Sequence, residues 1–248
     1  MENATSFGTQ ADIYAAARPS YPDALFDWIE QHAPALEQVW DVGTGSGQAA
    51  RSLAKRFKNV HATDIDSAQI KQALPAHNIT YVSAPSDASG LADDSVDAIT
   101  VATALHWFDF STFWQEAARV GRKGALFCAW TYHAIEAQAD IRGNLIMPIR
   151  DIIEPYWSDG NRLSWRGYPA DEVGMPFSEI KTPVFTMELS WTPAQLIQFM
   201  NSWSAHKRAR EDGHSANLKA IETQALARFD NTPRKLTLPI QTLAGRID

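Results

Sequence analysis

The chain has 248 residues, of which 45% are hydrophobic and 21% are charged, and its net charge of −7 argues against sequence-independent binding to nucleic acid. No apolar run reaches the ~20 residues that span a bilayer, and the first residues do not begin a signal peptide, so we expect no membrane association and a cytoplasmic location. The single cysteine, Cys128, rules out an internal disulfide and argues against a structural zinc site, so no bound metal is expected.

The first 130 residues alternate between helical and extended patterns. Apolar residues at helical spacing predict helices over 21–32, 48–57, 67–74 and 110–120. Short apolar runs predict strands over 39–42, 60–63, 79–83, 96–104 and 125–130. This alternation is typical of an α/β fold that is doubly wound, with a mostly parallel sheet and helices on both faces.

The regular alternation ends after residue 130. We expect a helix over 134–159, a turn-rich stretch over 160–177, helices over 192–203 and 216–229, and strands over 184–189 and 235–243. The last two strands would close the edge of a seven-stranded sheet. We therefore predict a single domain over 1–248, in which residues 134–177 form a helical lid insertion that covers the site.

A glycine-rich turn follows the first strand. It contains Asp41, then Gly43, Thr44, Gly45 and Gly47, and a predicted helix begins directly after it. Glycines allow a sharp turn and the close approach of a ligand, and the N-terminus of a helix presents free N–H groups. A dinucleotide fingerprint would need a third glycine at position 48, which is glutamine. A carboxylate at the head of the turn suits the ammonium and sulfonium of S-adenosylmethionine better than a pyrophosphate.

Further cofactor-binding candidates follow the next three strands. Asp64, followed by Ile65, ends the second strand about 20 residues beyond the glycine turn, where a carboxylate can bind both ribose hydroxyls. The alternative is that Asp64 caps a helix, although Asp66 is the better capping candidate. After the third strand, Ser86 and Asp87 either contact the adenine or lie in a solvated loop.

Small residues after the fourth strand let a ligand approach the sheet closely. Thr103 and Ala104 are the candidates there, and His106 follows them at the mouth of the predicted site. A lone histidine is often structural, and both a catalytic and a structural role for His106 stay open.

These motifs resemble those of the Rossmann-like S-adenosylmethionine-dependent methyltransferases. The opening Tyr14-Ala-Ala-Ala-Arg18-Pro-Ser-Tyr21-Pro is similar to that of a subgroup that includes the trans-aconitate methyltransferases. The segment His106-Trp-Phe-Asp is similar to a pattern in its fungal members, and the resemblance covers roughly residues 5–210. It implies S-adenosylmethionine as the cofactor and methyl transfer to a small molecule, plausibly a carboxylate oxygen. The stretch 160–176 matches no pattern of the family, which leaves the acceptor open.

The acceptor decides which further side chains are needed. A carboxylate is already ionised at pH 7 and needs a cationic partner, for which Arg18, between Tyr14 and Tyr21, is the best candidate. The basic residues that we consider weaker candidates, because solvated surface charges are common, are Arg162, Arg166, Lys207 and Arg208. A phenol, amine or carbon acceptor would instead need a base, with His106 the first choice.

Aromatic residues could line the pocket over the sulfonium. The candidates are Tyr14, Tyr21, Trp107 and Trp157, although for any single one of them plain packing is the better explanation, and we expect Trp203 to be a packing anchor.

Two other functions stay open at this point. One is a nicotinamide-dependent oxidoreductase on a similar sheet, which Gln48 disfavours, and the other is a non-catalytic cofactor-binding module. The expected partner is a small-molecule substrate of acidic character, and the sequence does not predict the oligomeric state.

Overall fold

The computed structural model describes residues 19–248, and its main feature is a mixed sheet whose first five strands are parallel. The strands are β1 (Gln38–Val42), β2 (Asn59–Asp64), β3 (Ile79–Ser83), β4 (Val96–Ala102), β5 (Gly121–Tyr132), β6 (Ser178–Glu179), β7 (Phe185–Trp191) and β8 (Arg234–Arg246). Their order is β3-β2-β1-β4-β5-β8-β6, and β7 also pairs with β8. The strand β8 is antiparallel to β5, β6 and β7.

This topology confirms the predicted doubly wound sheet. The chain runs from β1 outward through β2 to β3, and then returns to the other side of β1 with β4 and β5. The direction of winding therefore reverses between β1 and β4, which is where such sheets bind ligands beyond the carboxyl ends of their strands. The two-residue strand β6 was not predicted, and β4 ends at Ala102 rather than 104 because Thr103 has a left-handed backbone, with φ of 54°.

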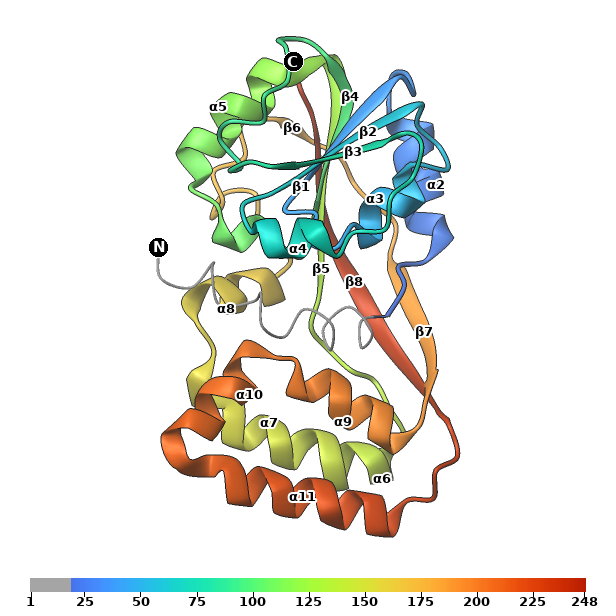
Figure 1. Ribbon diagram of the computed structural model, residues 1–248, viewed down its shortest axis with the longest axis vertical. Coiled ribbons are helices and arrows are strands. Elements are labelled where there is room, and N and C mark those ends of the chain that lie inside the picture. The colour runs from blue at the N-terminus through green and yellow to red at the C-terminus, as the bar shows by residue number, and fades with distance from the viewer. Residues whose placement is uncertain (1–18) are drawn as a thin grey trace.

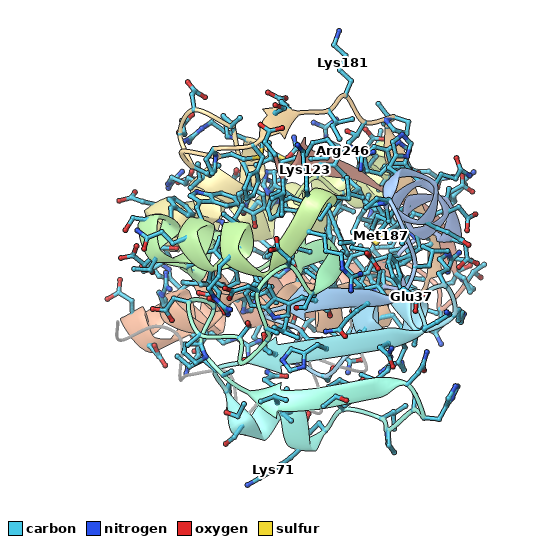
Figure 2. The ribbon with its side chains drawn as sticks, turned by 90° about the horizontal axis from the view of Figure 1, so that it is seen from above. Glu37, Lys71, Lys123, Lys181, Met187 and Arg246 are labelled. Atoms are coloured by element: carbon cyan, nitrogen blue, oxygen red, sulfur yellow. The ribbon has the colours of Figure 1, made fainter. Side chains whose placement is uncertain are left out.

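Helices on both faces bury the two sides of the sheet. They are α2 (Asp23–His32), α3 (Gln48–Leu53), α4 (Ser67–Lys71) and α5 (Phe110–Val120). Successive strand residues point to opposite faces, so Leu126 joins the core under α2 and α3, while Phe127 joins the core under α5. Seen from above, Lys71 on α4 and Lys181, just after β6, project at opposite extremes of the molecule (Figure 2).

A second group of helices packs below the sheet (Figure 1). It comprises α6 (Ala139–Ile141), η3 (Arg142–Ile146), α7 (Met147–Ile153), η4 (Glu154–Tyr156), α9 (Pro193–Asn201), α10 (Ser204–Ala209), η5 (Arg210–His214) and α11 (Ser215–Arg228). The helix α8 (Asp159–Trp165) lies between this helical layer and the sheet (Figure 1). Two chain segments build the layer, one before and one after β7, so the predicted insertion over 134–177 supplies only part of it. Its role as a lid stays a prediction.

Three details of this region differ from the predictions. The helix expected from 134 begins only at Ala139, because Glu136 exchanges two backbone hydrogen bonds with Thr237 and is extended. The helix α8 occupies part of the stretch expected to be turns, and the Ser158 hydroxyl, which accepts from the backbone N–H of Asn161, caps it. The helix α10 was not predicted. Over the described residues 19–248, no helix combines the length and the apolar character that crossing a membrane requires.

Candidate active site

The glycine turn lies between β1 and α3, at the point where the sheet reverses its winding. Its glycines all have a left-handed backbone, with φ of 66° at Gly43, 57° at Gly45 and 78° at Gly47. A Cβ atom on Gly43 would lie 2.6 Å from the Cβ of Ala104, so only glycine lets the turn pack against the end of β4. The nearest atom to a Cβ on Gly45 would be 3.9 Å away. The backbone of Gly45 is therefore open to a ligand.

The Asp41 carboxyl group lies beneath this turn and is fully buried. It accepts hydrogen bonds from the hydroxyls of Thr44 and, at 2.8 Å, Thr100. Burial raises the pKa of Asp41 to about 6, although the two hydroxyl groups oppose that rise. Asp41 thus braces Thr44 from below, and its direct contact with a cofactor stays a prediction.

Asp64, at the end of β2, braces the same turn from the side. One of its oxygens accepts from the backbone N–H of Gly45 at 2.8 Å, and the other accepts from that of Asp66 at 2.8 Å. Burial raises the pKa of the Asp64 carboxyl group, while these two N–H groups lower it. Each oxygen retains a lone pair for a further donor. Asp66 caps α4 as predicted, by accepting from Ala68, and the neighbouring side chain of Ile65 is exposed.

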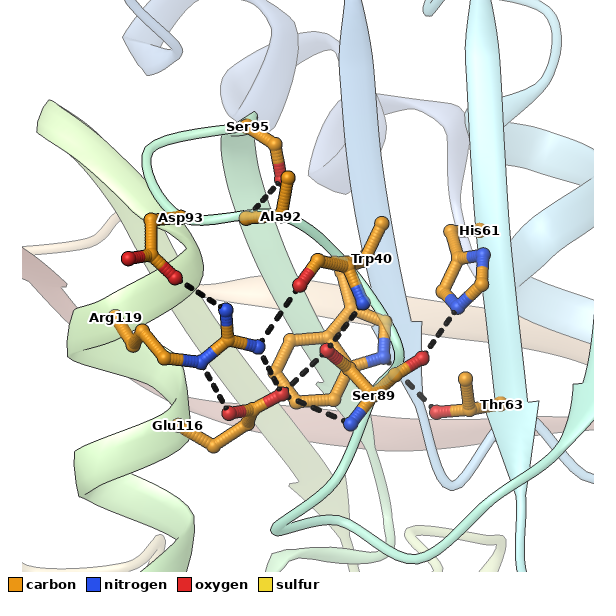
Figure 3. A network of polar contacts seen from close by, with 10 residues as sticks. Trp40, His61, Thr63, Ser89, Ala92, Asp93, Ser95, Glu116 and Arg119 are labelled. Carbon is orange, nitrogen blue, oxygen red and sulfur yellow. Dashed lines mark hydrogen bonds and ion pairs between the residues drawn. The ribbon is translucent and has the colours of Figure 1, made fainter.

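The loop that follows β3 carries Ser86, which is half-buried, and Asp87, which is exposed. A polar network holds the next turn of this loop against α5 (Figure 3). In it, the backbone N–H and hydroxyl of Ser89 both donate to Glu116, which also pairs with Arg119. Burial favours a higher pKa for Glu116, but the bonds from Arg119 and Ser89 hold it below its usual value. The anchored Ser89 limits where Ser86 and Asp87 can lie.

The residues after β4 join the glycine turn to a cavity. The left-handed backbone of Thr103 is unusual for a β-branched residue, and such strain is concentrated at functional sites. Its hydroxyl lies 3.1 Å from the Tyr21 hydroxyl, and the Ala104 methyl packs towards Gly43. The Nδ1 of His106 lies 2.8 Å from the hydroxyl of Tyr168, a buried residue.

The cavity encloses about 110 Å³ at the carboxyl ends of β4 and β5. Its described lining residues come from the sheet and from the helical layer: Thr103, His106, Trp107, Thr131, Tyr132, His133, Arg150, Trp157, Asn161, Ser164, Trp165, Phe199, Ser202, Trp203 and Ser204. Trp107 and Trp157, two of the predicted pocket aromatics, thus line this cavity, and their position over a sulfonium stays a prediction. Trp203, expected to be a packing anchor, also forms part of the wall, because α10 begins directly after it at the cavity.

Not all predicted acceptor residues lie in this wall. Tyr21 lies behind Thr103 and packs edge-on against Trp130 at 5.5 Å, outside the cavity lining. The predicted residues Tyr14 and Arg18 lie outside the described residues.

The four weaker basic candidates are engaged elsewhere. Arg162 pairs with Glu154, Arg166 with Glu172 and Lys207 with Glu211, while Arg208 donates to the Tyr156 carbonyl at 2.7 Å.

The basic side chain of the cavity wall, Arg150 on α7, was missed by the sequence reasoning. The signal available for it was a single arginine within the apolar run Leu145-Ile-Met-Pro-Ile-Arg150-Asp-Ile-Ile. His133, Asn161 and Trp165 were missed as well, because nothing local relates them to Arg150. They meet only when α7 and α8 pack below β5.

Comparison with known proteins identifies relatives of this chain. Residues 40–129 match the family model of the methyltransferase domain. A Dictyostelium discoideum protein named as a methyltransferase is 28% identical over 233 residues, which cover 91% of this chain and 87% of the relative. A Mycobacterium tuberculosis protein named as an uncharacterised methyltransferase is 31% identical over 176 residues, which cover 66% of this chain and 71% of the relative.

A solved structure shows the same fold at higher identity. A protein from Anaeromyxobacter dehalogenans, titled as a type II methyltransferase, superimposes with a TM-score of 0.85 at 36% identity. The match covers 93% of this chain and 98% of that chain.

Proposed function

The chain belongs to the methyltransferase domain family and uses S-adenosylmethionine, and we propose that it methylates a carboxylate oxygen of a small acidic molecule. The finer proposal is an acid of the kind that the trans-aconitate methyltransferases accept, which the opening motif of the sequence suggests. One observation carries the acidic acceptor: the described wall of the cavity contains Arg150 and no Asp or Glu side chain.

The residues around the glycine turn fit the cofactor. The open space at Gly45 accommodates a ligand against the backbone, and Asp64 keeps acceptor capacity for ribose hydroxyls. When bound, S-adenosylmethionine supplies an electrophilic methyl group on a sulfonium that departs as a neutral thioether. We propose that Asp64 holds the ribose, that Ser86 and Asp87 frame the adenine, and that Thr103 separates the cofactor from the acceptor cavity.

The cavity would act mainly by position. A carboxylate is ionised at pH 7, so it needs no general base, and its reactivity depends on alignment and on the exclusion of water. Aromatic side chains from the helical layer, such as Trp157 and Trp203, form part of the cavity wall. We propose that this layer, including the predicted lid over 134–177, excludes water from the site.

A transfer assay tests this function. Purified protein is incubated with methyl-labelled S-adenosylmethionine and a panel of small carboxylic acids. The panel also contains the amides of these acids, and separate phenols and primary amines. We expect label only in the acids, as an ester that mild base hydrolyses. The proposal would be overturned if only phenols or amines became labelled, or if no compound in the panel became labelled.

A further inference from the structure

Arg150 is a half-buried cation at the wall of the acceptor cavity. Among the residues that the structure describes, no carboxylate lies within 4.0 Å of its guanidinium group. Arg162, on the neighbouring α8, instead has Glu154 at 2.6 Å. The carboxylates of Asp151 and Glu154 act on Arg150 only from beyond ion-pair distance. Removing a charge from water without a direct partner is costly, so a cation retained at a cavity wall indicates an anionic ligand.

The contact that Arg150 does make leaves its charge in place. Its Nη2 lies 2.7 Å from Nε2 of His133. A guanidinium group can only donate, so Nε2 accepts and the neutral imidazole carries its proton on Nδ1. Burial, and then the charge of Arg150, lower the pKa of His133 to about 4. His133 therefore orients the guanidinium group without neutralising it.

Stacked rings fix this pair in the wall. The His133 ring lies on the Trp165 ring, with centroids 4.0 Å apart and planes 19° apart. The ring of Trp157 contacts the rings of Trp165 and Trp203, with centroid distances of 5.0 Å and 5.7 Å. In Figure 1 the helix α8, which carries Trp165, lies between the sheet and α7, which carries Arg150.

The lining is also rich in ring faces. Six of the fifteen described lining residues are Phe, Trp or Tyr. Such walls favour a ligand with a ring or a conjugated chain, because flat π-systems stack on aromatic side chains. The guanidinium group binds a carboxylate with two parallel hydrogen bonds, which lysine cannot reproduce.

We propose that Arg150 anchors a carboxylate of a flat, aromatic or conjugated acid in this cavity, and that His133 is a positioning residue for its guanidinium group. The inference rests on the proposed function, because it assigns the acceptor class to the same cavity. Arg150 lies on the helical layer, and Thr103 lies at the end of β4. Arg150 thus lies apart from the glycine turn proposed to contact the cofactor. In this proposal Arg150 selects the acid, and it takes no part in binding the cofactor.

The test is calorimetric titration of the full chain, loaded with S-adenosylhomocysteine, with cinnamate and with its uncharged amide, cinnamamide. We expect Arg150→Gln to weaken cinnamate binding by about 10- to 100-fold, and to leave cinnamamide within about 2-fold. Arg150→Lys keeps the charge but loses the second hydrogen bond, so its cinnamate affinity should lie between those of the wild type and of Arg150→Gln. The matched control is Arg142→Gln, which removes an exposed arginine whose charge acts on Arg150 without lining the cavity, and it should change the binding of either ligand by less than about 2-fold.

His133 is tested by kinetics on the acid acceptor that the transfer assay identifies. We expect His133→Ala to raise KM with little change in kcat, and His133→Asn, which restores an acceptor for Arg150, to recover most of the loss. A purely structural role would lower kcat as well as raise KM, and His133→Asn would not rescue it. Equal effects in the two variants contradict the positioning role.

Two results would overturn the inference. One is a wild-type protein that binds S-adenosylhomocysteine but binds cinnamate no better than cinnamamide. The other is cinnamate affinity that Arg150→Gln and Arg150→Lys both leave unchanged. The proposed function fails separately: if the acid binds through Arg150 but never accepts labelled methyl, the inference stands and the methylation of acids is wrong.

Discussion

The cofactor region and the acceptor region of this protein are built in different ways. Around the glycine turn, Asp41 and Asp64 lie at the carboxyl ends of neighbouring strands and brace the same turn, and all of these residues fall between positions 41 and 64. The acceptor cavity instead draws on residues from 103 to 204, which come from β5, from the residues just after β4, and from several helices of the described chain. Because its residues lie close together in the sequence, the first region is recognisable from one motif, whereas no single motif spans the residues of the second region.

The two regions also have opposite electrostatic character. The cofactor region places the carboxyl groups of Asp41 and Asp64 next to the backbone turn, and Asp41, with a pKa of about 6, is mostly ionised at pH 7. The acceptor cavity contains Arg150 and the neutral His133. This contrast suits a cationic methyl donor on one side and an anionic acceptor on the other.

The largest expected effect lies in the cofactor region. Gly43→Ala adds a methyl group 2.6 Å from Ala104 at a left-handed position, so we expect it to destabilise the protein by about 2–5 kcal/mol. It should also abolish measurable S-adenosylmethionine binding. Gly90→Ala is the matched control, because Gly90 is also left-handed but a Cβ there meets nothing within 4 Å, and it should cost only about 1–2 kcal/mol. Similar losses of stability in denaturant unfolding would show that the packing against Ala104 is unimportant.

The second prediction tests whether Asp64 serves the cofactor region alone. Asp64→Ala removes the partner of the Gly45 N–H and the predicted ribose acceptor, so S-adenosylmethionine affinity should fall by about 10- to 100-fold in calorimetry. Asp66→Ala, which removes only a helix cap, should change affinity little. Acid binding in the cavity should survive both changes. Equal affinities for the two variants would remove Asp64 from the cofactor site.

The third prediction concerns the buried charge beneath the turn. The pKa of Asp41 is raised from 3.8 to about 6 in the folded protein, so the folded state binds the proton more tightly than the unfolded state. The resulting stabilisation is present at low pH and is lost as pH rises through about 6. The free energy of unfolding of the wild type, relative to Asp41→Asn, should therefore fall by about 1–2 kcal/mol between pH 4.5 and 7.5. Urea titrations measure both free energies of unfolding. If the difference between wild type and Asp41→Asn did not change between these pH values, the raised pKa of Asp41 would be contradicted.

The smallest effect is expected at His106, because a carboxylate acceptor needs no base. His106→Ala should lower kcat/KM for an acid by less than about 10-fold, the modest loss expected of a residue that shapes a wall. Tyr168→Phe, which removes only the hydroxyl that contacts His106, should have a similar small effect. A much larger loss for His106→Ala, with a pH–rate shoulder near 6.5 in the wild type, would show that His106 is a general base.

Sequence reasoning succeeded where a residue's position along the chain determines its neighbours. The parallel strands and the capping role of Asp66 follow from local patterns. Over 134–177 the expected helix was right for residues 139–156, but its start and the helix α8 were missed, because such short helices are held by packing instead of periodicity. Sequence reasoning also could not show that Glu136 pairs with Thr237, a contact across 101 residues of chain.

The sequence by itself determined the doubly wound sheet, the glycine turn and the cofactor, because apolar periodicity and the Asp-x-Gly-x-Gly-x-Gly spacing act over a few residues. Only the tertiary structure decided that Arg150 and His133 meet at the cavity and that Arg162 and Arg166 do not reach it. The physical reason is that a buried site between layers is assembled by the packing of helices on strand ends. That packing depends on side-chain shapes summed over the whole core and not on any short segment.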